Sequence, residues 1–113
     1  MQNPIQNNVR PLVTVAMPVY NAGKYLRLAV LSIVKQTFAD WEMLIIDDGS
    51  TDNTTSIIKK YADIQLFHKA GRSGKMAAIN RVMPLIETPI TIFSDANAML
   101  NTEAIQEIVK HFS

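Results

Sequence analysis

The stretch MLIIDDGSTD, residues 43–52, contains the pattern that determines the fold class. Its first four residues are apolar and include two isoleucines, which is typical of a strand buried on both faces of a sheet. Two aspartates end this run, and Gly49 and Ser50 then favour a turn. Asp52 is a suitable N-cap, so the pattern predicts a helix from there to about Tyr61. A buried strand with an acidic end, followed by a helix, indicates an α/β fold.

The same succession of strand and helix is predicted around this unit. Apolar runs predict strands over 12–17, 64–68 and 90–93, and apolar spacing predicts helices over 24–36 and 75–83 and a last helix capped by Thr102. The expected buried helix faces are Leu26, Ala29, Val30, Ile33 and Val34 in the first, and Ile105, Ile108, Val109 and Phe112 in the last. This order predicts a three-layer αβα fold with a mostly parallel sheet over residues 11–113, preceded by a flexible arm at 1–10.

Composition restricts the class of protein. The chain has 113 residues, of which 48% are hydrophobic, and its 11 Lys and Arg against 10 Asp and Glu give a net charge of +1. These values describe a globular domain and argue against disorder and against nucleic-acid binding. The absence of cysteine excludes disulfides and cysteine-based zinc sites. No apolar run approaches the roughly 20 residues that a bilayer requires, and the polar start at 1–8 is not a signal peptide.

Polar residues follow three of the four predicted strands: Tyr20 and Asn21 the first, Asp47 and Asp48 the second, and Asp95 and Asn97 the fourth. In open parallel sheets, ligands bind beyond the carboxyl ends of the strands, where the strand order reverses. We therefore expect these residues to mark one ligand site. The two histidines, His68 and His111, show no spacing that would predict a metal pair.

Three common nucleotide and phosphate sites fit poorly. A dinucleotide site requires three glycines after the first strand, and the segment PVYNAGKY, residues 18–25, has one. A P-loop requires Ser or Thr after Gly-Lys, and Met76 follows Lys75. A phospho-receiver domain would carry its acidic pair after the first strand, whereas here the pair follows the second. A non-catalytic, receiver-like or nucleotide-sensing module stays open as the weaker alternative.

Four segments together are characteristic: VTVAMPVYNAGKYL at 13–26, SIVKQTFADWEMLIIDDGSTDNT at 32–54, SGKMAAIN at 73–80 and FSDANAML at 93–100. With these segments the chain resembles the inverting, family 2 glycosyltransferases of the GT-A fold. The resemblance extends over nearly the whole chain after the N-terminal arm. It implies a domain that binds a nucleoside-diphosphate sugar, with UDP-sugars favoured.

The resemblance implies roles for individual residues. Positions matching Pro18, Tyr20 and Asp48 line the nucleobase pocket in the family, and the position matching Lys75 is associated with the donor phosphate or ribose. The chemistry agrees, because Tyr20 offers an aromatic face and Asp48 can accept a hydrogen bond from a base N–H. A basic residue at a helix start favours a diphosphate. Asp47 is expected to be more structural than Asp48.

Asp95-Ala96-Asn97 occupies the place of the family's DxD motif, where two carboxylates hold Mg²⁺ or Mn²⁺ against the diphosphate. Asp95 and Asn97 are therefore the expected metal ligands, and Asp95 also a donor-binding residue. The amide of Asn97 carries no charge, so we expect weakened metal binding. A degenerate transferase that has lost its metal is a further alternative.

In the resembled family the catalytic base and the acceptor site lie in a second half, and no residue here matches the base. The sequence is therefore expected to be a donor-binding portion that is catalytically silent alone, with a saccharide or lipid acceptor bound by the missing half. A truncated sheet predicts self-association through its edge. The expected location is the cytoplasm or the cytoplasmic face of a membrane.

Overall fold

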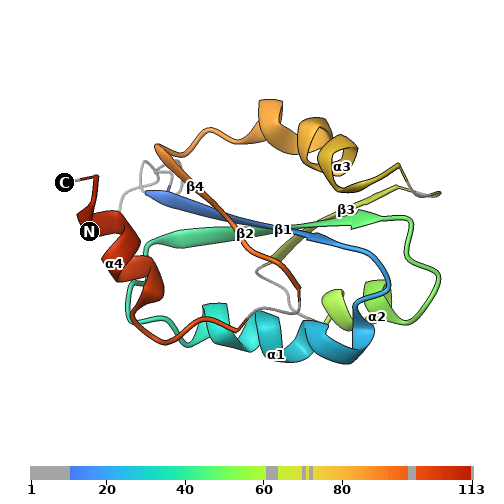
Figure 1. The fold of residues 1–113 in the computed structure, drawn as a ribbon, viewed down its shortest axis with the longest axis horizontal. Helices are drawn as coiled ribbons and strands as arrows, with labels where there is room; N and C mark the ends of the chain where they lie inside the picture. The colour runs from blue at the N-terminus through green and yellow to red at the C-terminus, as the bar shows by residue number, and fades with distance from the viewer. Residues whose placement is uncertain (1–10, 61–63, 70, 72, 97–98, 113) are drawn as a thin grey trace, which may run out of the picture.

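The computed structural model describes residues 11–60, 64–69, 71, 73–96 and 99–112. Strands and helices alternate as predicted (Figure 1). They are β1 (Val13–Val19), α1 (Gly23–Val34), β2 (Trp41–Asp48), α2 (Thr54–Ile58), β3 (Ile64–Lys69), α3 (Lys75–Val82), the 3-10 helix η2 (Met83–Leu85), β4 (Ile90–Phe93) and α4 (Ala104–Lys110). The predicted arm at 1–10 lies outside the described residues.

The four strands form one parallel sheet in the order β3-β2-β1-β4. The chain builds outward from β1 through β2 to β3 and then returns to place β4 on the other side of β1. The strand order therefore reverses between β1 and β4, which is where open parallel sheets bind their ligands. The register pairs Val19 with Asp47 and Asp48 with Lys69, so the carboxyl ends of β1, β2 and β3 lie side by side.

Helices cover the two faces of the sheet unequally. In Figure 1, α1 and α2 lie on one side of the sheet and α3 lies on the other. The larger hydrophobic core joins β1 and β2 to α1, α2 and α4 through fully buried residues such as Leu26, Ile45 and Ile105. The α3 side holds a small core of Ala16, Ile46, Ala78 and Val82. This confirms the predicted αβα arrangement.

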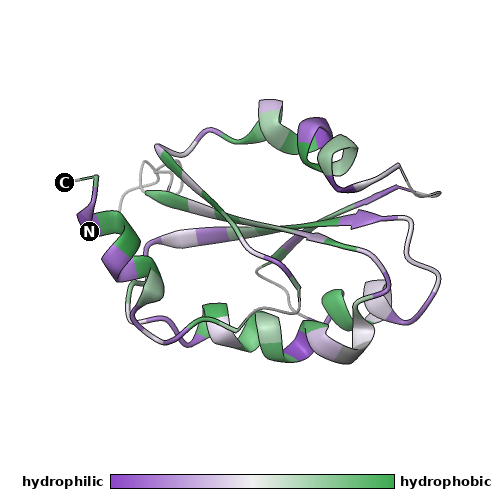
Figure 2. Ribbon diagram, viewed as in Figure 1, coloured by the Kyte–Doolittle hydropathy of each residue, from purple (hydrophilic) through white to green (hydrophobic). Residues whose placement is uncertain are grey.

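Hydropathy follows this layering. Figure 2 shows hydrophobic residues along the central strands and a mixture of hydrophobic and hydrophilic residues along the helices. The carboxyl end of β2 is hydrophilic, and yet Asp47 and Asp48 there are 0% and 3% exposed. Buried carboxylates need hydrogen-bond donors, so this strand end requires a polar network. Within the described part of the chain, no helix has the length and apolarity to cross a membrane.

Some predicted helix details are wrong. The N-cap of α2 is Asn53 rather than Asp52, although the Asp52 carboxylate still accepts the N–H of Thr54 at 3.0 Å. The N-cap of α4 is Glu103 rather than Thr102, because the Asn101 side chain accepts the Glu103 N–H at 3.0 Å and starts the turn.

Two predicted core residues are exposed. Val34 is the last residue of α1 and is 50% exposed, and Phe112 follows α4 and is 69% exposed. Both lie where the helix ends, so the periodic pattern continues past the last turn that packs on the sheet. The helix predicted to reach about Tyr61 is also too long, because α2 ends at Ile58 with Lys59 as its C-cap; Tyr61 itself lies outside the described part of the chain.

Candidate functional site

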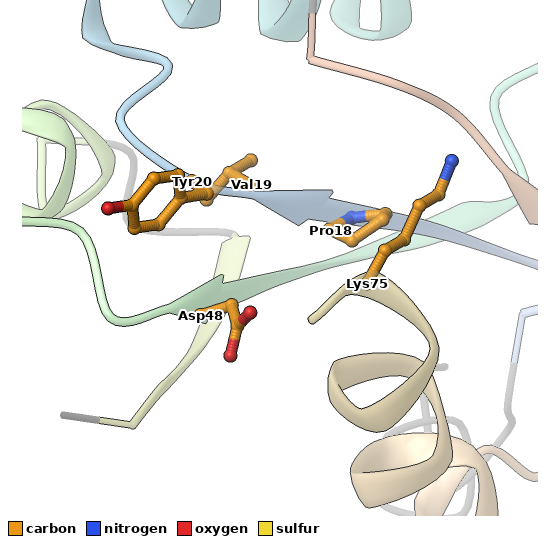
Figure 3. Close-up of a pocket in the computed structure, with 5 residues that line it drawn as sticks. All are labelled: Pro18, Val19, Tyr20, Asp48 and Lys75. Carbon is orange, nitrogen blue, oxygen red and sulfur yellow. The ribbon is translucent and has the colours of Figure 1, made fainter. Parts of the chain in front are cut away.

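A pocket of about 170 Å³ lies at the carboxyl ends of β1 and β2 (Figure 3). It is lined by Pro18, Val19, Tyr20, Asp48 and Lys75. The structure thus brings together four of the residues predicted from sequence to bind a nucleotide-sugar, which come from β1, the turn after it, β2 and the start of α3. Their roles in binding stay predictions. Tyr20 is 39% exposed, so its ring is accessible at the rim.

A second hollow of about 430 Å³ shares Pro18, Val19 and Tyr20 with the first and continues to Asp95 after β4. The two hollows therefore adjoin at the end of β1, where the strand order reverses. Lys75 connects them, because its Nζ lies 2.8 Å from Asp95 Oδ1. Figure 3 shows the Lys75 side chain leaving the start of α3 and pointing away from Asp48. The ends of β1, β2 and β4 and the start of α3 thus meet here.

Asp48 is bound by the loop before α3. Its Oδ1 accepts the backbone N–H of Ser73 at 2.9 Å, and its Oδ2 accepts the N–H of Gly74 at 2.7 Å. Gly74 has a φ of +99°, a conformation that favours glycine, and is the N-cap of α3. Sequence reasoning assigned Asp48 to the nucleobase and did not foresee this anchor, because the hydrogen bonds join segments 25 and 26 residues apart.

Asp47 points to the opposite face of the sheet and has a structural environment. Its carboxylate accepts the N–H of Ser50 at 3.0 Å and the hydroxyl of Thr55 at 3.1 Å, and lies 2.8 Å from Nδ1 of His68. Burial raises the pKa of Asp47, but these hydrogen bonds outweigh burial and hold the pKa below the ordinary value of 3.8. Asp47 thus has the structural environment predicted for it, whereas the binding role predicted for Asp48 stays a prediction.

Two residues near this network make contacts that sequence reasoning did not foresee, although Asn21 was among those expected to mark the ligand site. His68 pairs with Asp47 because parallel register places them opposite each other on β3 and β2. Asn21 has a φ of +48°, and its side-chain oxygen accepts the N–H of Thr51 at 2.8 Å. Its own N–H donates to Ser50 Oγ at 2.9 Å. Asn tolerates this left-handed conformation better than most residues, which is the one sequence signal for its role.

Asp95 is the described member of the predicted metal pair, and Asn97 lies outside the described residues. The side chain of Asp95 is 59% exposed, and the ammonium of Lys75 beside it shows that a cation is accommodated there. The described residues include no group of three or more His, Asp or Glu that could hold a metal. A divalent cation at Asp95 would therefore need oxygen ligands from a bound diphosphate. With that supplement, the residues fit a weakly held cation.

Residues 14–113 match the family described as "Glycosyl transferase family 2", and the chain belongs to this family of transferases. A glycosyltransferase of Haemophilus influenzae is 32% identical over 101 residues, which cover 86% of this chain and 40% of the relative. The Escherichia coli enzyme WfgD, named as a UDP-Glc:α-D-GlcNAc-diphosphoundecaprenol β-1,3-glucosyltransferase, is 33% identical over 76% of this chain and 35% of its own length. The chain thus spans two fifths or less of these relatives.

Solved structures agree on the GT-A fold. Residues 1–349 of Staphylococcus aureus TarS, in complex with UDP-GlcNAc, superpose with a TM-score of 0.81 at 27% identity, over 87% of this chain and 30% of that one. The mannosyltransferase PcManGT of Pyrobaculum calidifontis, in complex with GDP-Man and Mn²⁺, gives a TM-score of 0.74 at 28% identity, over 80% and 29%. The resemblance inferred from sequence is confirmed, as is its fold.

Proposed function

We propose that this chain binds the nucleoside-diphosphate sugar donor of an inverting glycosyltransferase, with UDP-sugars as the favoured donors. One observation carries the proposal: Pro18, Tyr20, Asp48 and Lys75 line a single pocket at the strand ends, and Lys75 reaches Asp95 at the reversal of strand order. The relatives in complex with UDP-GlcNAc and GDP-Man support a nucleotide-sugar as the ligand.

The pocket offers a distinct chemistry to each part of the donor. Tyr20 presents an aromatic ring on which a base can stack. Asp48 lines the pocket, and its carboxylate oxygens are hydrogen-bond acceptors that a base N–H can approach. Lys75 carries a positive charge between the pocket and Asp95, where a diphosphate would lie. The base, the diphosphate and the cation would thus lie in this order from the end of β2 to the end of β4.

We propose that Asp95 and Asn97 hold Mg²⁺ or Mn²⁺ together with the diphosphate, with reduced affinity because Asn97 is uncharged. When bound, such a cation stabilises the negative charge on the departing nucleoside diphosphate. The relative in complex with GDP-Man and Mn²⁺ supports a divalent cation in this family. Restoring the second carboxylate with Asn97→Asp should then strengthen metal-dependent nucleotide binding.

Sugar transfer also needs a base that takes the proton from the acceptor hydroxyl. Among the residues that the structure describes we assign no base, because the two carboxylates of the site are already engaged with Ser73 and Gly74 or with Lys75. We propose that this donor-binding portion is inactive alone and that acceptor and base belong to the rest of a longer enzyme. The lipid-diphosphate acceptor in the name of WfgD supports a saccharide or lipid acceptor. We propose the cytoplasm or the cytoplasmic face of a membrane as the location.

We also propose that the isolated chain self-associates through the β4 edge of its sheet. β4 is an outer strand, and its Phe93 is 45% exposed. Exposed strand edges pair readily with other chains. Sedimentation velocity over a concentration series should show dimers or larger species, and a monomer at every concentration would contradict this.

The test of donor binding is an NMR titration of the ¹⁵N-labelled chain with UDP, GDP and dTDP, each with and without Mg²⁺. We expect UDP to shift the amides around Tyr20, Asp48 and Lys75 at the lowest concentration, and Mg²⁺ to add a shift at Asp95. ADP-ribose serves as a control for non-specific diphosphate binding. A folded chain whose resonances stay unchanged with all three nucleotides would overturn the proposal.

A further inference from the structure

We propose that Asp48 is a positioning residue for Lys75, so that one carboxylate sets both the base pocket and the diphosphate end of the site. This inference rests on the proposed donor site and deepens it. If Asp48 only contacted the base, it would be a recognition residue and nothing more. The hydrogen bonds in the structure give it a second role, because they reach the residues immediately before Lys75.

The contacts of Asp48 are strong and buried. The residue is 3% exposed, and its two oxygens accept one backbone N–H each, at 2.9 Å from Ser73 and 2.7 Å from Gly74. Hydrogen bonds to an ionised carboxylate are roughly twice as strong as neutral ones. Loss of these two hydrogen bonds would therefore cost a buried carboxylate part of its compensation for burial. The end of β2 therefore fixes the backbone of residues 73 and 74.

The position of Lys75 follows from this anchor. Gly74 is the N-cap of α3 and Lys75 is its first residue, so only one peptide unit separates the anchored N–H from the lysine. Lys69, opposite Asp48 in register, donates to Ser73 Oγ at 2.5 Å and ties the same loop from β3. From this start the Lys75 side chain spans to Asp95, with a separation of 2.8 Å between Nζ and Oδ1.

Apolar packing of α3 begins only after its first residues. In the described part of the chain, the fully buried residues of the small core that come from α3 are Ala78 and Val82, three and seven residues after Lys75. Met76 and Ala77 are exposed. The residues directly before and at the start of α3 are therefore held by polar contacts, those of Asp48 and Lys69, rather than by apolar packing, and a change at Asp48 should displace Lys75.

The two possible roles of Asp48 predict different results for a ligand series. If Asp48 contacts only the base, Asp48→Asn should weaken uridine, UMP and UDP by the same factor. If Asp48 positions Lys75, the loss should grow with each phosphate. The positioning role further requires that Asp48→Asn has little additional effect once Lys75 is replaced by Met.

The experiment measures dissociation constants by NMR titration for the unmodified chain, Asp48→Asn, Lys75→Met and the double variant. We expect Asp48→Asn to weaken the binding of UDP about tenfold more than the binding of uridine, because a displaced Lys75 no longer meets the diphosphate. In the Lys75→Met background the extra loss should fall to about twofold or less. Asp47→Asn is the matched control, because it changes a neighbouring buried carboxylate that does not contact residues 73 and 74. Equal losses across the series, or additive losses in the double variant, would overturn the inference.

A ligand-free measurement separates this inference from the proposed function. Introduced alone, Lys75→Met should shift the side-chain carboxyl ¹³C resonance of Asp95, because Lys75 and Asp95 form an ion pair. In the Asp48→Asn background the same substitution should shift it much less. If the unmodified chain binds no nucleotide, the proposed donor binding is wrong. The Asp95 resonance then still tests whether Asp48 positions Lys75. Should Asp48→Asn not fold, Ser73→Pro removes one N–H to Asp48 while keeping the carboxylate, and it should reduce the same response. An unchanged response in that variant would contradict the inference.

Discussion

The two faces of the sheet differ in how they are held together. The face covered by α1, α2 and α4 carries the larger core, with residues such as Leu26, Ile45 and Ile105 completely buried. The cluster of buried apolar residues beneath α3 has four members in the described part of the chain, two of them alanines. The candidate site lies at the strand ends, and its Asp48 and Lys75 belong to the side with less apolar packing. The comparison teaches that the charged residues of the first hollow come from the face that contributes less apolar packing.

Asp47 and Asp48 show this division within one strand. Consecutive side chains of a strand point to opposite faces, so two adjacent aspartates enter different environments. Asp47 joins β2 to α2 and β3 through Thr55 and His68. Asp48 joins β2 to the start of α3 and lines the pocket. The same chemical group is thus structural on one face and part of the candidate site on the other.

The largest effect should come from Ile45→Ala compared with Ile46→Ala. These neighbours are both 0% exposed, and they belong to the larger and the smaller core respectively. Replacing a buried isoleucine by alanine costs about 2–5 kcal/mol, depending on how far the surroundings can collapse. We expect Ile45→Ala near the top of this range and Ile46→Ala near the bottom, since the short α3 can shift to fill the cavity. Urea unfolding of both variants measures this, and an equal or greater loss for Ile46→Ala would reverse the comparison.

Asp47→Asn should be the next largest in its effect on stability. The substitution weakens hydrogen bonds to a buried charged group, which is worth about 1–3 kcal/mol at neutral pH. Because the folded-state pKa of Asp47 lies below its ordinary value of 3.8, the stability from this carboxylate is complete above that pH and is lost as the pH falls through the folded pKa.

The measurement is urea unfolding of the unmodified chain and of Asp47→Asn at pH values from 7 down to 3. The difference between the unmodified chain and Asp47→Asn should be constant near neutrality and shrink below about pH 3.8. Asp52→Asn is measured in parallel, because hydrogen bonds from Thr54 also hold the pKa of Asp52 below its ordinary value, but at an exposed position. A difference that persists undiminished at pH 3 would remove Asp47 as the acid-sensitive group of this face.

The sequence allowed the fold and the location of the site to be predicted. Apolar runs such as residues 43–46 predict buried strands, and the polar residues at the strand ends indicate the location of the site. Local signals of this kind are read directly from neighbouring residues. Helix ends were less predictable, because Thr102 and Asp52 compete with adjacent polar residues for the cap.

Interactions between distant segments could not be predicted from the sequence. The anchor between Asp48 and Gly74, the pairing of Asp47 with His68 and the ion pair between Lys75 and Asp95 each depend on strand register or on where a helix begins. No local pattern encodes them. The resemblance to a family assigned individual roles, but it did not show how the residues support one another.

Lys75→Met should separate binding from stability. We expect UDP to bind about tenfold more weakly, equivalent to about 1.4 kcal/mol, because a positive charge beside the diphosphate is lost. Urea unfolding should change little, since the ion pair with Asp95 is exposed. Lys110→Met provides the control, because Lys110 is also an exposed helical lysine with an acidic partner, Glu107. If both variants lower UDP affinity equally, the effect is one of net charge and the α3 face loses its special role.

Asp95→Asn should have the smallest effect on stability and the most selective effect on binding. Exposed ion pairs contribute about 0–1 kcal/mol, so the free energy of unfolding should stay within about 1 kcal/mol of the unmodified chain. Calorimetric titration with UDP should show that Mg²⁺ no longer increases the affinity, whereas metal-free binding is preserved or slightly improved because Lys75 is released from Asp95 toward the diphosphate. Glu107→Asn is the matched control, since it breaks the other exposed lysine pair far from the strand ends. A stability loss well above 1 kcal/mol would show that the ion pair holds α3 to β4, and the face with the site would then also be a face that maintains the fold.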